Sequence, residues 1–212
     1  MTENIVVFGH NSIGVKSDLG MIYVDPFKLK ESPKDASYIL VTHEHYDHFS
    51  PEDIEKVAGS DTVLVVPESM KVKAQEAAGL VKKIVTVTPG EDRDVDGLSL
   101  ETVPAYNIDK KFHPKSNEWV GYILNVAGKR IYVAGDTDAT PEAKMVKCDV
   151  AIIPVGGTYT MDIRQAATLV NEIKPAVAIP VHYGCIVGEA SDGEAFAKLV
   201  KEPVKAELKI KF

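Results

Sequence analysis

The sequence predicts an α+β fold in which β-sheets are covered by helices. Two observations support this prediction: short apolar runs rich in valine and isoleucine recur along the chain, and fewer segments show helical periodicity. The expected strands are residues 5–8, 21–25, 38–41, 63–66, 84–87, 98–103, 120–126, 131–133, 150–154, 177–181 and 208–212. Because strands outnumber helices and only the last third alternates the two, helix-covered sheets are favoured over a purely parallel α/β fold.

The expected helices cover residues 51–58, 68–78, 161–173 and 193–201. The first has a clear start signal, because Ser50 is a favoured N-cap residue and Pro51 is favoured at the first helical position. The most polar loop, residues 107–118, lies between two expected strands and has the length of many functional loops. Since no Gly/Ser-rich or Pro-rich linker and no short-period repeat divides the chain, we expect one domain over residues 1–212.

Composition narrows the class of protein without naming a function. The chain has 212 residues, of which 45% are hydrophobic and 26% charged, as in ordinary soluble globular proteins. Its net charge of -7 disfavours nucleic acid or an anionic membrane as a partner, because both select clustered lysine and arginine. We expect neither a signal peptide nor a membrane span. The two cysteines, Cys148 and Cys185, lack C-x-x-C spacing, so a disulfide or thiolate zinc site is not expected and a cytoplasmic location is favoured.

Three of the six histidines lie within residues 43–48, whose sequence is HEHYDH, directly after an apolar run. In an extended segment, residues two apart point the same way, so His43 and His45 are expected to approach one metal ion together. Asp47 and His48 follow beyond the bend, where they can address a second ion. Imidazole and carboxylate are ordinary zinc ligands, and two ions about 3.5 to 4 Å apart can hold a hydroxide between them. The alternative is a solvated histidine-rich loop without metal.

Two further candidate ligands follow expected strands. His182 stands at a strand end, as His43 does, and we expect it to bind metal. Asp136 lies in a Gly-Asp-Thr-Asp turn, where the glycine allows close backbone approach, so its carboxylate can bridge two ions. The alternative for Asp136 is an ordinary Asx turn. The competing carboxylate, Asp138, is expected to remain solvated.

The order of these motifs resembles the metallo-β-lactamase superfamily over nearly the whole chain. That order is His43-x-His45-x-Asp47-His48, a later histidine, then Gly135-Asp136-Thr137 and finally His182. Within the superfamily, the sequence is similar to the branch that contains L-ascorbate-6-phosphate lactonase. The pieces that carry this similarity are Gly9-His10, Val24-Asp25-Pro26, Gly135 to Asp138, Pro154 to Met161 and Pro180 to Gly184. The resemblance implies a four-layer αβ/βα sandwich with two metal ions at the edge where the sheets meet.

The resemblance also implies a ligand set. The expected ligands are His43 and His45 for the first ion, Asp47, His48 and His182 for the second, and Asp136 as the bridge. The third histidine of the first site departs from the family pattern, because many relatives place it in a Gly-His turn whereas this strand leads into Asn107. His113 is our candidate for that ligand, since the loop is long enough to return to the first ion. Asn107 is the alternative, as a weak ligand or as a residue that positions a water.

Other residues are expected to support the site. Asp25 is a candidate hydrogen-bond acceptor for a ligand histidine, because ligand rings usually donate their free N–H to a carboxylate or carbonyl. His10, in a Gly-His-Asn-Ser turn, is a candidate pocket residue, with a capping or core role as the alternative. Cys185, three residues after His182, is expected to be buried.

A substrate-binding turn is expected at Gly157, Thr158 and Tyr159, just before a helix. Its backbone N–H groups are candidates for binding an anion such as phosphate. The loop lysines expected to supply counter-charge are Lys110, Lys111 and Lys115. The alternative is that Thr160 caps the helix and these lysines are solvated.

The expected function is a metal-dependent hydrolase in which a hydroxide between two metal ions cleaves an ester, lactone or phosphoester of a small, neutral or anionic metabolite. Asp47 and Asp136 are the expected catalytic carboxylates, with Asp47 orienting the nucleophile. The expected cofactor is two divalent ions, zinc first, because His and Asp also suit manganese, iron, cobalt and nickel. The expected partner is a small-molecule substrate. The alternative function is a metal-binding sensor or scaffold without turnover.

Overall fold

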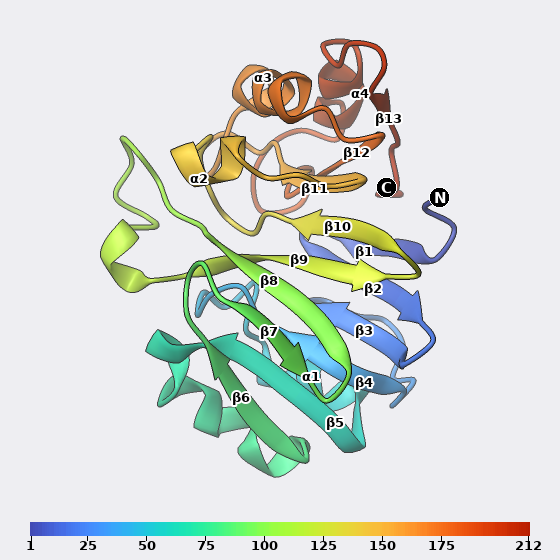
Figure 1. The fold of residues 1–212 in the computed structure, drawn as a ribbon, viewed down its shortest axis with the longest axis vertical. Coiled ribbons are helices and arrows are strands. Elements are labelled where there is room, and N and C mark those ends of the chain that lie inside the picture. Colours follow the sequence, from blue (N-terminus) through green and yellow to red (C-terminus); the bar gives the residue numbers. More distant parts are fainter.

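The computed structural model describes residues 1–212 as two mixed β-sheets packed face to face, each with helices on its outer side (Figure 1). The first sheet contains β1 (Ile5–Gly9), β2 (Ser12–Ser17), β3 (Gly20–Val24), β4 (Ala36–Leu40), β5 (Ala58–Pro67) and β6 (Lys83–Val87), in that order. The second contains, in spatial order, β13 (Lys205–Ala206), β12 (Val177–Val181), β11 (Val150–Pro154), β10 (Lys129–Val133), β9 (Val120–Val126), β8 (Leu98–Pro104) and β7 (Asp92–Val95).

Helices form the two outer layers. The helices over the first sheet are α1 (Pro51–Val57) and the 3-10 helices η1 (Glu68–Met70) and η2 (Lys73–Leu80). The helices over the second sheet are α2 (Pro141–Lys144), α3 (Ile163–Ile173) and α4 (Asp192–Ala197), and a 3-10 turn, η3 (Lys115–Asn117), lies in the loop between β8 and β9. The layer order of helix, sheet, sheet and helix confirms the predicted αβ/βα sandwich.

The layers follow from the alternation of side chains along each strand. In β11, Val150 and Ile152 point into the core between the sheets, whereas Ala151 and Ile153 pack toward the helices. The central core contains 25 buried residues drawn from both sheets, and 19 and 14 further buried residues hold the helical layers. Because both faces of these strands are buried, they read in the sequence as continuous apolar runs.

Several element predictions were incomplete or wrong. The strands β2 and β7 were not predicted, because the sequences SIGVKS and DRDV contain no long apolar run. The predicted strand at 208–212 is wrong, since pairing with β12 is confined to Lys205 and Ala206. The predicted helix at 68–78 is instead two 3-10 helices, and the four-residue helix α2 was missed.

Helix starts show how local sequence fixes the elements near the site. Ser50 caps α1 by accepting a hydrogen bond from the backbone N–H of Asp53, as predicted. Helix α3 begins two residues later than predicted because Asp162, and not Thr160, is its cap. Asp162 and Gln165 exchange side-chain and backbone hydrogen bonds in a capping box. None of the helices is both long and apolar enough to cross a membrane.

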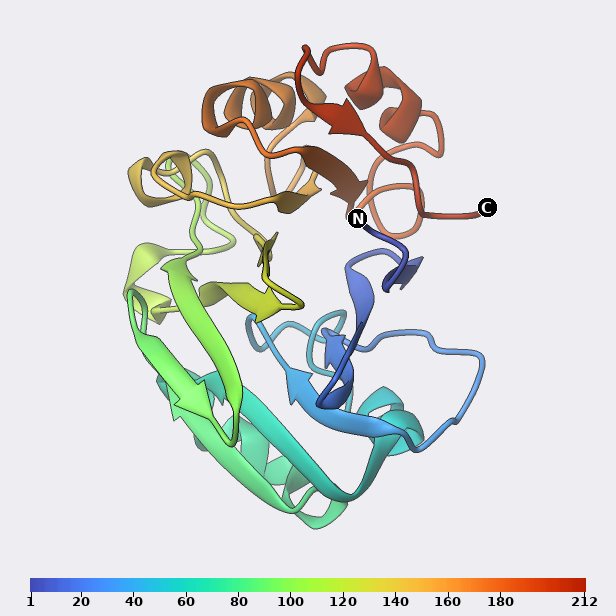
Figure 2. The ribbon, with the colours of Figure 1, turned by 45° about the vertical axis from the view of Figure 1, so that its right-hand side comes forward.

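The two ends of the chain lie next to each other beside β1 (Figure 2). The hydroxyl of Thr2 donates to Glu207, and the amine of Lys209 donates to the carbonyl oxygen of Thr2 at 3.0 Å. The backbone N–H of His182, at the end of β12, donates to the carbonyl oxygen of His10 at 2.8 Å. The first strand of one sheet therefore ends beside a strand end of the other sheet.

Candidate metal centre

All six histidines of the chain gather in one cluster with Asp47 and Asp136. They occupy strand ends and loops at one edge of the sandwich: His10 follows β1, residues 43–48 follow β4, and His182 follows β12. The rings of His10 and His182, from opposite ends of the chain, have centroids only 3.9 Å apart. Because both sheets bring strand ends to this edge, residues remote in sequence meet there.

The first ligand group consists of His43, His45 and His113. Nε2 of His43 and Nδ1 of His45 lie 3.0 Å apart. The indole of Trp119 packs against all three rings, at centroid distances of 4.9, 4.9 and 5.6 Å. The loop thus folds back far enough to bring His113 to the group.

Asn107 stands behind His113. Its Oδ1 accepts a hydrogen bond from the backbone N–H of His113 at 3.0 Å and lies 3.1 Å from Nδ1 of the same residue. Its Nδ2 donates to the carbonyl oxygen of Tyr159 at 2.9 Å. Because both ends of the amide are engaged, Asn107 orients His113 in this structure and has no atom directed at the cluster.

The second ligand group consists of His10, Asp47, His48 and His182, all of them buried. Oδ2 of Asp47 is its centre. This oxygen lies 2.9 Å from Nε2 of His10, 3.6 Å from Nε2 of His48 and 3.8 Å from Nε2 of His182. His10 was predicted to line the pocket, and the structure places it in direct contact with Asp47, a predicted metal ligand.

Asp136 connects the two groups. Its Oδ2 lies 3.1 Å from Nε2 of His182 and 3.3 Å from Nε2 of His113, while its Oδ1 lies 3.4 Å from Nε2 of His48. The preceding Gly135 has φ of 64°, and a Cβ there would come within 3.0 Å of the Thr42 side chain. Glycine is therefore needed to let the Asp136 turn approach the end of β4.

Buried atoms of the cluster lack partners. Nε2 of His48, His113 and His182 and Oδ1 of Asp136 are all buried and make no hydrogen bond. An unsatisfied buried polar group costs on the order of 1–3 kcal/mol, so four such atoms converging at one point fit a site for a divalent cation. Imidazole nitrogen and carboxylate oxygen are the donors that zinc and related divalent ions take. These residues fit a metal centre.

The electrostatics of the cluster favour neutral His43 and His10 and two ionised carboxylates, whereas Asp136 outweighs burial and raises the pKa of His48 and of His182. Burial lowers the pKa of His43 well below its usual value, and burial lowers the pKa of His10 to about 4. Burial by itself would raise the pKa of Asp47 and of Asp136. The hydrogen bond from His10 and the nearby rings of His182 and His48 outweigh burial and lower the pKa of Asp47, and the charges of His182 and His48 lower that of Asp136. Both carboxylates are therefore ionised at neutral pH, as metal ligands must be.

Asp25 lies behind the cluster and is fully buried. Its Oδ2 is 2.7 Å from Nδ1 of His48 and accepts hydrogen bonds from Asn11 Nδ2 at 2.8 Å and Thr42 Oγ1 at 2.7 Å. Its Oδ1 accepts from the backbone N–H of Thr42 at 2.8 Å. A ring that donates Nδ1–H to a carboxylate has its Nε2 lone pair free for a metal. Asn11 and Thr42 were missed in the sequence because each reads as an ordinary turn or strand-end residue.

The turn predicted to bind an anion uses its N–H groups internally. The N–H of Gly157 donates to the carbonyl oxygen of Met161, and that of Thr158 donates to Gly156, both at 3.0 Å. Tyr159 is the member of this turn that contacts the site loop, through its carbonyl oxygen and through its ring, which packs edge-on against Phe112. The N–H groups of Gly157 and Thr158 are therefore not free to bind an anion. The turn can still offer the ring of Tyr159 for apolar contact.

The loop lysines and Asp138 also differ from expectation. Lys110 pairs with Asp138, and Lys115 lies 2.8 Å from a carboxylate oxygen of Glu142, so neither is a free counter-charge. Lys111 is exposed and forms no ion pair, so its predicted role stays a prediction. The prediction that Asp138 is solvated is wrong, because the residue is 5% exposed and accepts from the backbone N–H of Ile108 at 2.9 Å. Asp138 therefore holds the loop that carries His113.

Three exposed apolar or aromatic side chains adjoin cluster residues in the sequence. Tyr46, Ile108 and Phe112 are 67%, 55% and 46% exposed and are sequence neighbours of Asp47, Asn107 and His113. The ring of Tyr46 packs against Phe27, which in turn lies beside His10. Cys185 is exposed and not buried as predicted, with its sulfur 3.6 Å from the amine of Lys28.

Comparison with known proteins agrees with this geometry. Residues 4–182 match the β-lactamase superfamily domain. A UPF0173 metal-dependent hydrolase of Pyrococcus abyssi is 31% identical over 198 residues, which are 87% of this chain and 86% of that protein. Another, from Symbiobacterium thermophilum, is 31% identical over 209 residues, covering 92% of this chain and 90% of that protein.

Solved structures show the same fold. A metal-dependent hydrolase from Parabacteroides distasonis superposes with a TM-score of 0.81 at 31% identity, covering 98% of this chain and 93% of that one. A metallo hydrolase from Ignicoccus hospitalis superposes with a TM-score of 0.76 at 24% identity, covering 98% and 95%. The second similarity concerns the fold alone.

Proposed function

We infer the function of this chain from its site and its family, since the chain belongs to the β-lactamase superfamily and, within it, to the UPF0173 metal-dependent hydrolases. We propose that residues 1–212 form one catalytic domain that holds two divalent ions, zinc first, and hydrolyses an ester or lactone of a small molecule. The observation that carries this proposal is the pair of buried ligand groups joined by Asp136.

The proposed ligands follow the two groups. For the first ion they are His43, His45 and His113; for the second they are Asp47, His48 and His182; Asp136 serves both. His10 is placed beside Asp47 as its hydrogen-bond donor, because its Nε2 lies 2.9 Å from Oδ2 of that residue. Asp25 orients His48 from behind.

The two catalytic carboxylates have different surroundings. Bound divalent ions supply an acidified water and polarise the electrophilic group of the substrate. Asp47 is 8% exposed and keeps a lowered pKa, so it is suited to accept a hydrogen bond from the attacking water and orient it. A carboxylate with so low a pKa is a weak general base, which makes orientation its main contribution. Asp136, at 4% exposed, is proposed to hold the two ligand groups in register.

The rim of the site favours an uncharged substrate. Tyr46, Ile108, Phe112 and Tyr159 offer apolar contact, and Lys110 and Lys115 are already paired with carboxylates. Besides the two divalent ions, a strongly anionic phosphoester would draw on free cations or N–H donors to replace its hydration, and among the three loop lysines only Lys111 forms no ion pair. We therefore rank esters and lactones above phosphoesters as the bond that is cleaved.

The test combines metal analysis with a matched substrate panel. Elemental analysis of the purified protein is expected to show two divalent ions for each chain. Turnover of an aryl ester, a γ-lactone and an aryl phosphodiester is then compared, before and after treatment with a chelator. The expected result is chelator-sensitive hydrolysis of the ester or lactone. Full metal content with no turnover of any member would instead support a metal-binding sensor or scaffold.

A further inference from the structure

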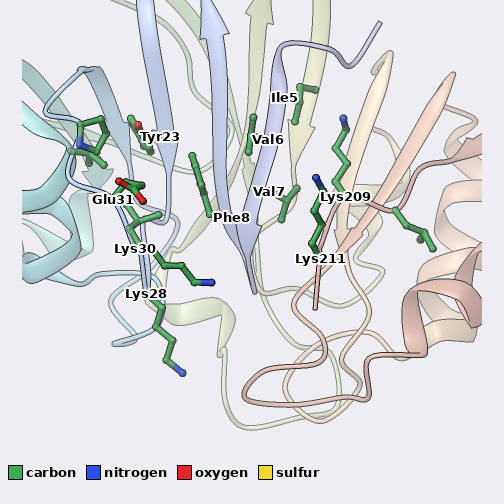
Figure 3. Close-up of a pocket in the computed structure, with 14 residues that line it drawn as sticks. Ile5, Val6, Val7, Phe8, Tyr23, Lys28, Lys30, Glu31, Lys209 and Lys211 are labelled. Atoms are coloured by element: carbon green, nitrogen blue, oxygen red, sulfur yellow. The ribbon is translucent and has the colours of Figure 1, made fainter.

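A groove of about 650 Å³ runs along the outer side of β1, away from the metal ligands (Figure 3). Its walls are the loop at residues 28–33 and the C-terminal segment at residues 208–211. Val6 and Phe8 of β1 lie on its floor and are 46% and 45% exposed. The ring of Phe8 stacks on Tyr23 with centroids 5.7 Å apart, so the floor is a continuous apolar surface.

This surface exists because the helical layer stops short of β1. Ile5 and Val7 point into the central core, so the alternate residues Val6 and Phe8 must point to the outer face. The buried cluster that joins the first sheet to α1 and η2 contains no residue of β1 or β2. An apolar surface left open in this way is typical of a binding site.

Positive charge surrounds the apolar floor. Lys28 and Lys30 stand on one side of Phe8, and Lys209 and Lys211 stand on the other (Figure 3). Only Lys209 is near a carboxylate, at 3.7 Å from Glu207, and the other three lysines form no ion pair. The only acidic residue that lines the groove is Glu31. In a chain with a net charge of -7, this local excess of cations selects an anionic group.

We propose that the groove binds one dissolved amphiphilic anion, with its apolar chain on Val6 and Phe8 and its carboxylate, phosphate or sulfate between Lys30 and Lys211. The volume lies in the range of small-molecule sites, which are mostly apolar with few polar groups that fix orientation. A hollow encloses a single apolar chain, whereas binding to a membrane surface requires apolar side chains that protrude. The proposal does not rest on the hydrolytic function, because none of the metal-cluster residues lines the groove.

The test is calorimetric titration of the purified protein with dodecanoate, kept below its micelle concentration. The variant Lys30→Glu/Lys211→Glu is expected to bind at least about tenfold more weakly, because two attractive charges become repulsive. The matched control, Lys71→Glu/Lys147→Glu, has the same change in net charge at exposed lysines outside the groove and should bind as the unmodified protein does. Dodecyltrimethylammonium, with the same chain and a cationic head, should bind more weakly than dodecanoate.

A second variant tests the apolar floor. Phe8→Ser removes a half-exposed ring, so the fold should persist while dodecanoate affinity falls. Unchanged affinity in both groove variants would overturn the proposal, as would binding that is lost only when metal is removed by a chelator. A Phe8-dependent dimer, or Phe8-dependent sedimentation with phosphatidylglycerol vesicles, would show another occupant and would also overturn it.

Discussion

The two ligand groups are built differently although they share Asp136. In the second group, His10 and His182 directly follow strands, Asp47 and His48 lie in the segment that leads into α1, and all four are buried. The first group depends on His113, which is carried by a long loop, and its His45 is only partly buried. Asp25 backs the second group by direct contact with His48, whereas the aromatic face of Trp119 backs the first.

This difference predicts a division of roles. Ligands that are all buried and backed by a buried carboxylate are pre-organised, so the second group should bind its ion more tightly. A group that relies on a loop opens more easily, so the first ion should be lost first and should lie nearer the substrate.

Asp136→Ala should abolish the distinction between the groups by disturbing both. Loss of an outer partner of a ligand typically costs about 10- to 100-fold in affinity or activity, so loss of the shared carboxylate should cost more than about 100-fold in turnover. Elemental analysis should show loss of both ions, and a denaturation curve should show that the chain remains folded. Retention of one ion at full occupancy would show that Asp136 belongs to a single group.

Asp47→Ala and His113→Ala should separate the groups. Trp119 is the single tryptophan of the chain and contacts only the first group, so its fluorescence should report cobalt(II) bound there. Asp47→Ala is expected to keep this quenching and lose the second ion, and His113→Ala is expected to do the reverse. If His113→Ala still bound two ions tightly, His113 would be a pocket residue and not a ligand, and its loss would mainly raise KM.

Asp25→Asn should weaken the second group without emptying it. The amide can no longer offer two carboxylate oxygens to His48, Asn11 and Thr42, so affinity for the second ion should fall by about 10- to 100-fold. A smaller effect at the first group is expected through Thr42, whose hydroxyl lies 2.9 Å from Nδ1 of His43. Asp18→Asn, at an exposed turn, is the control. An equal loss of affinity for both ions would contradict the proposal that Asp25 acts mainly through His48.

Much of this site could be predicted because its residues follow apolar strands. Residues 43–48, Asp136 and His182 each come just after a run that is buried on both faces, and strand ends of a sandwich meet at its edge. The four-layer order was expected from the resemblance to the metallo-β-lactamase superfamily, whereas the strand and helix pattern alone predicted helix-covered sheets. Spacing thus contained the information on which side chains would converge.

The features of the site that the sequence did not predict depend on contacts between segments that are distant in the sequence. His10 enters the second group because β1 of one sheet ends beside β12 of the other, and nothing local to either strand encodes that contact. The burial of Asp138 depends likewise on the loop that folds over it. The strand β7 escaped detection because it is a polar edge strand whose first three residues are exposed.

Asp138→Ala should have the smallest effect and should fall on the first group alone. Its carboxylate pairs with Lys110 and accepts from the N–H of Ile108, and its own N–H donates to the carbonyl oxygen of Tyr106 at 2.9 Å. Removing the carboxylate frees the N–H of Ile108 and the amine of Lys110, so the loop should loosen at a cost of about 1–3 kcal/mol in unfolding free energy.

Because Asp138 touches no ligand of the second group, only the first ion should bind more weakly, by a few fold, in cobalt titrations followed by Trp119 fluorescence. The control is Asp109→Ala, which removes an exposed carboxylate from the same loop and should change neither stability nor quenching. If Asp138→Ala weakened both ions equally, the loop would support the whole centre. The first group would then be no more dependent on its loop than the second.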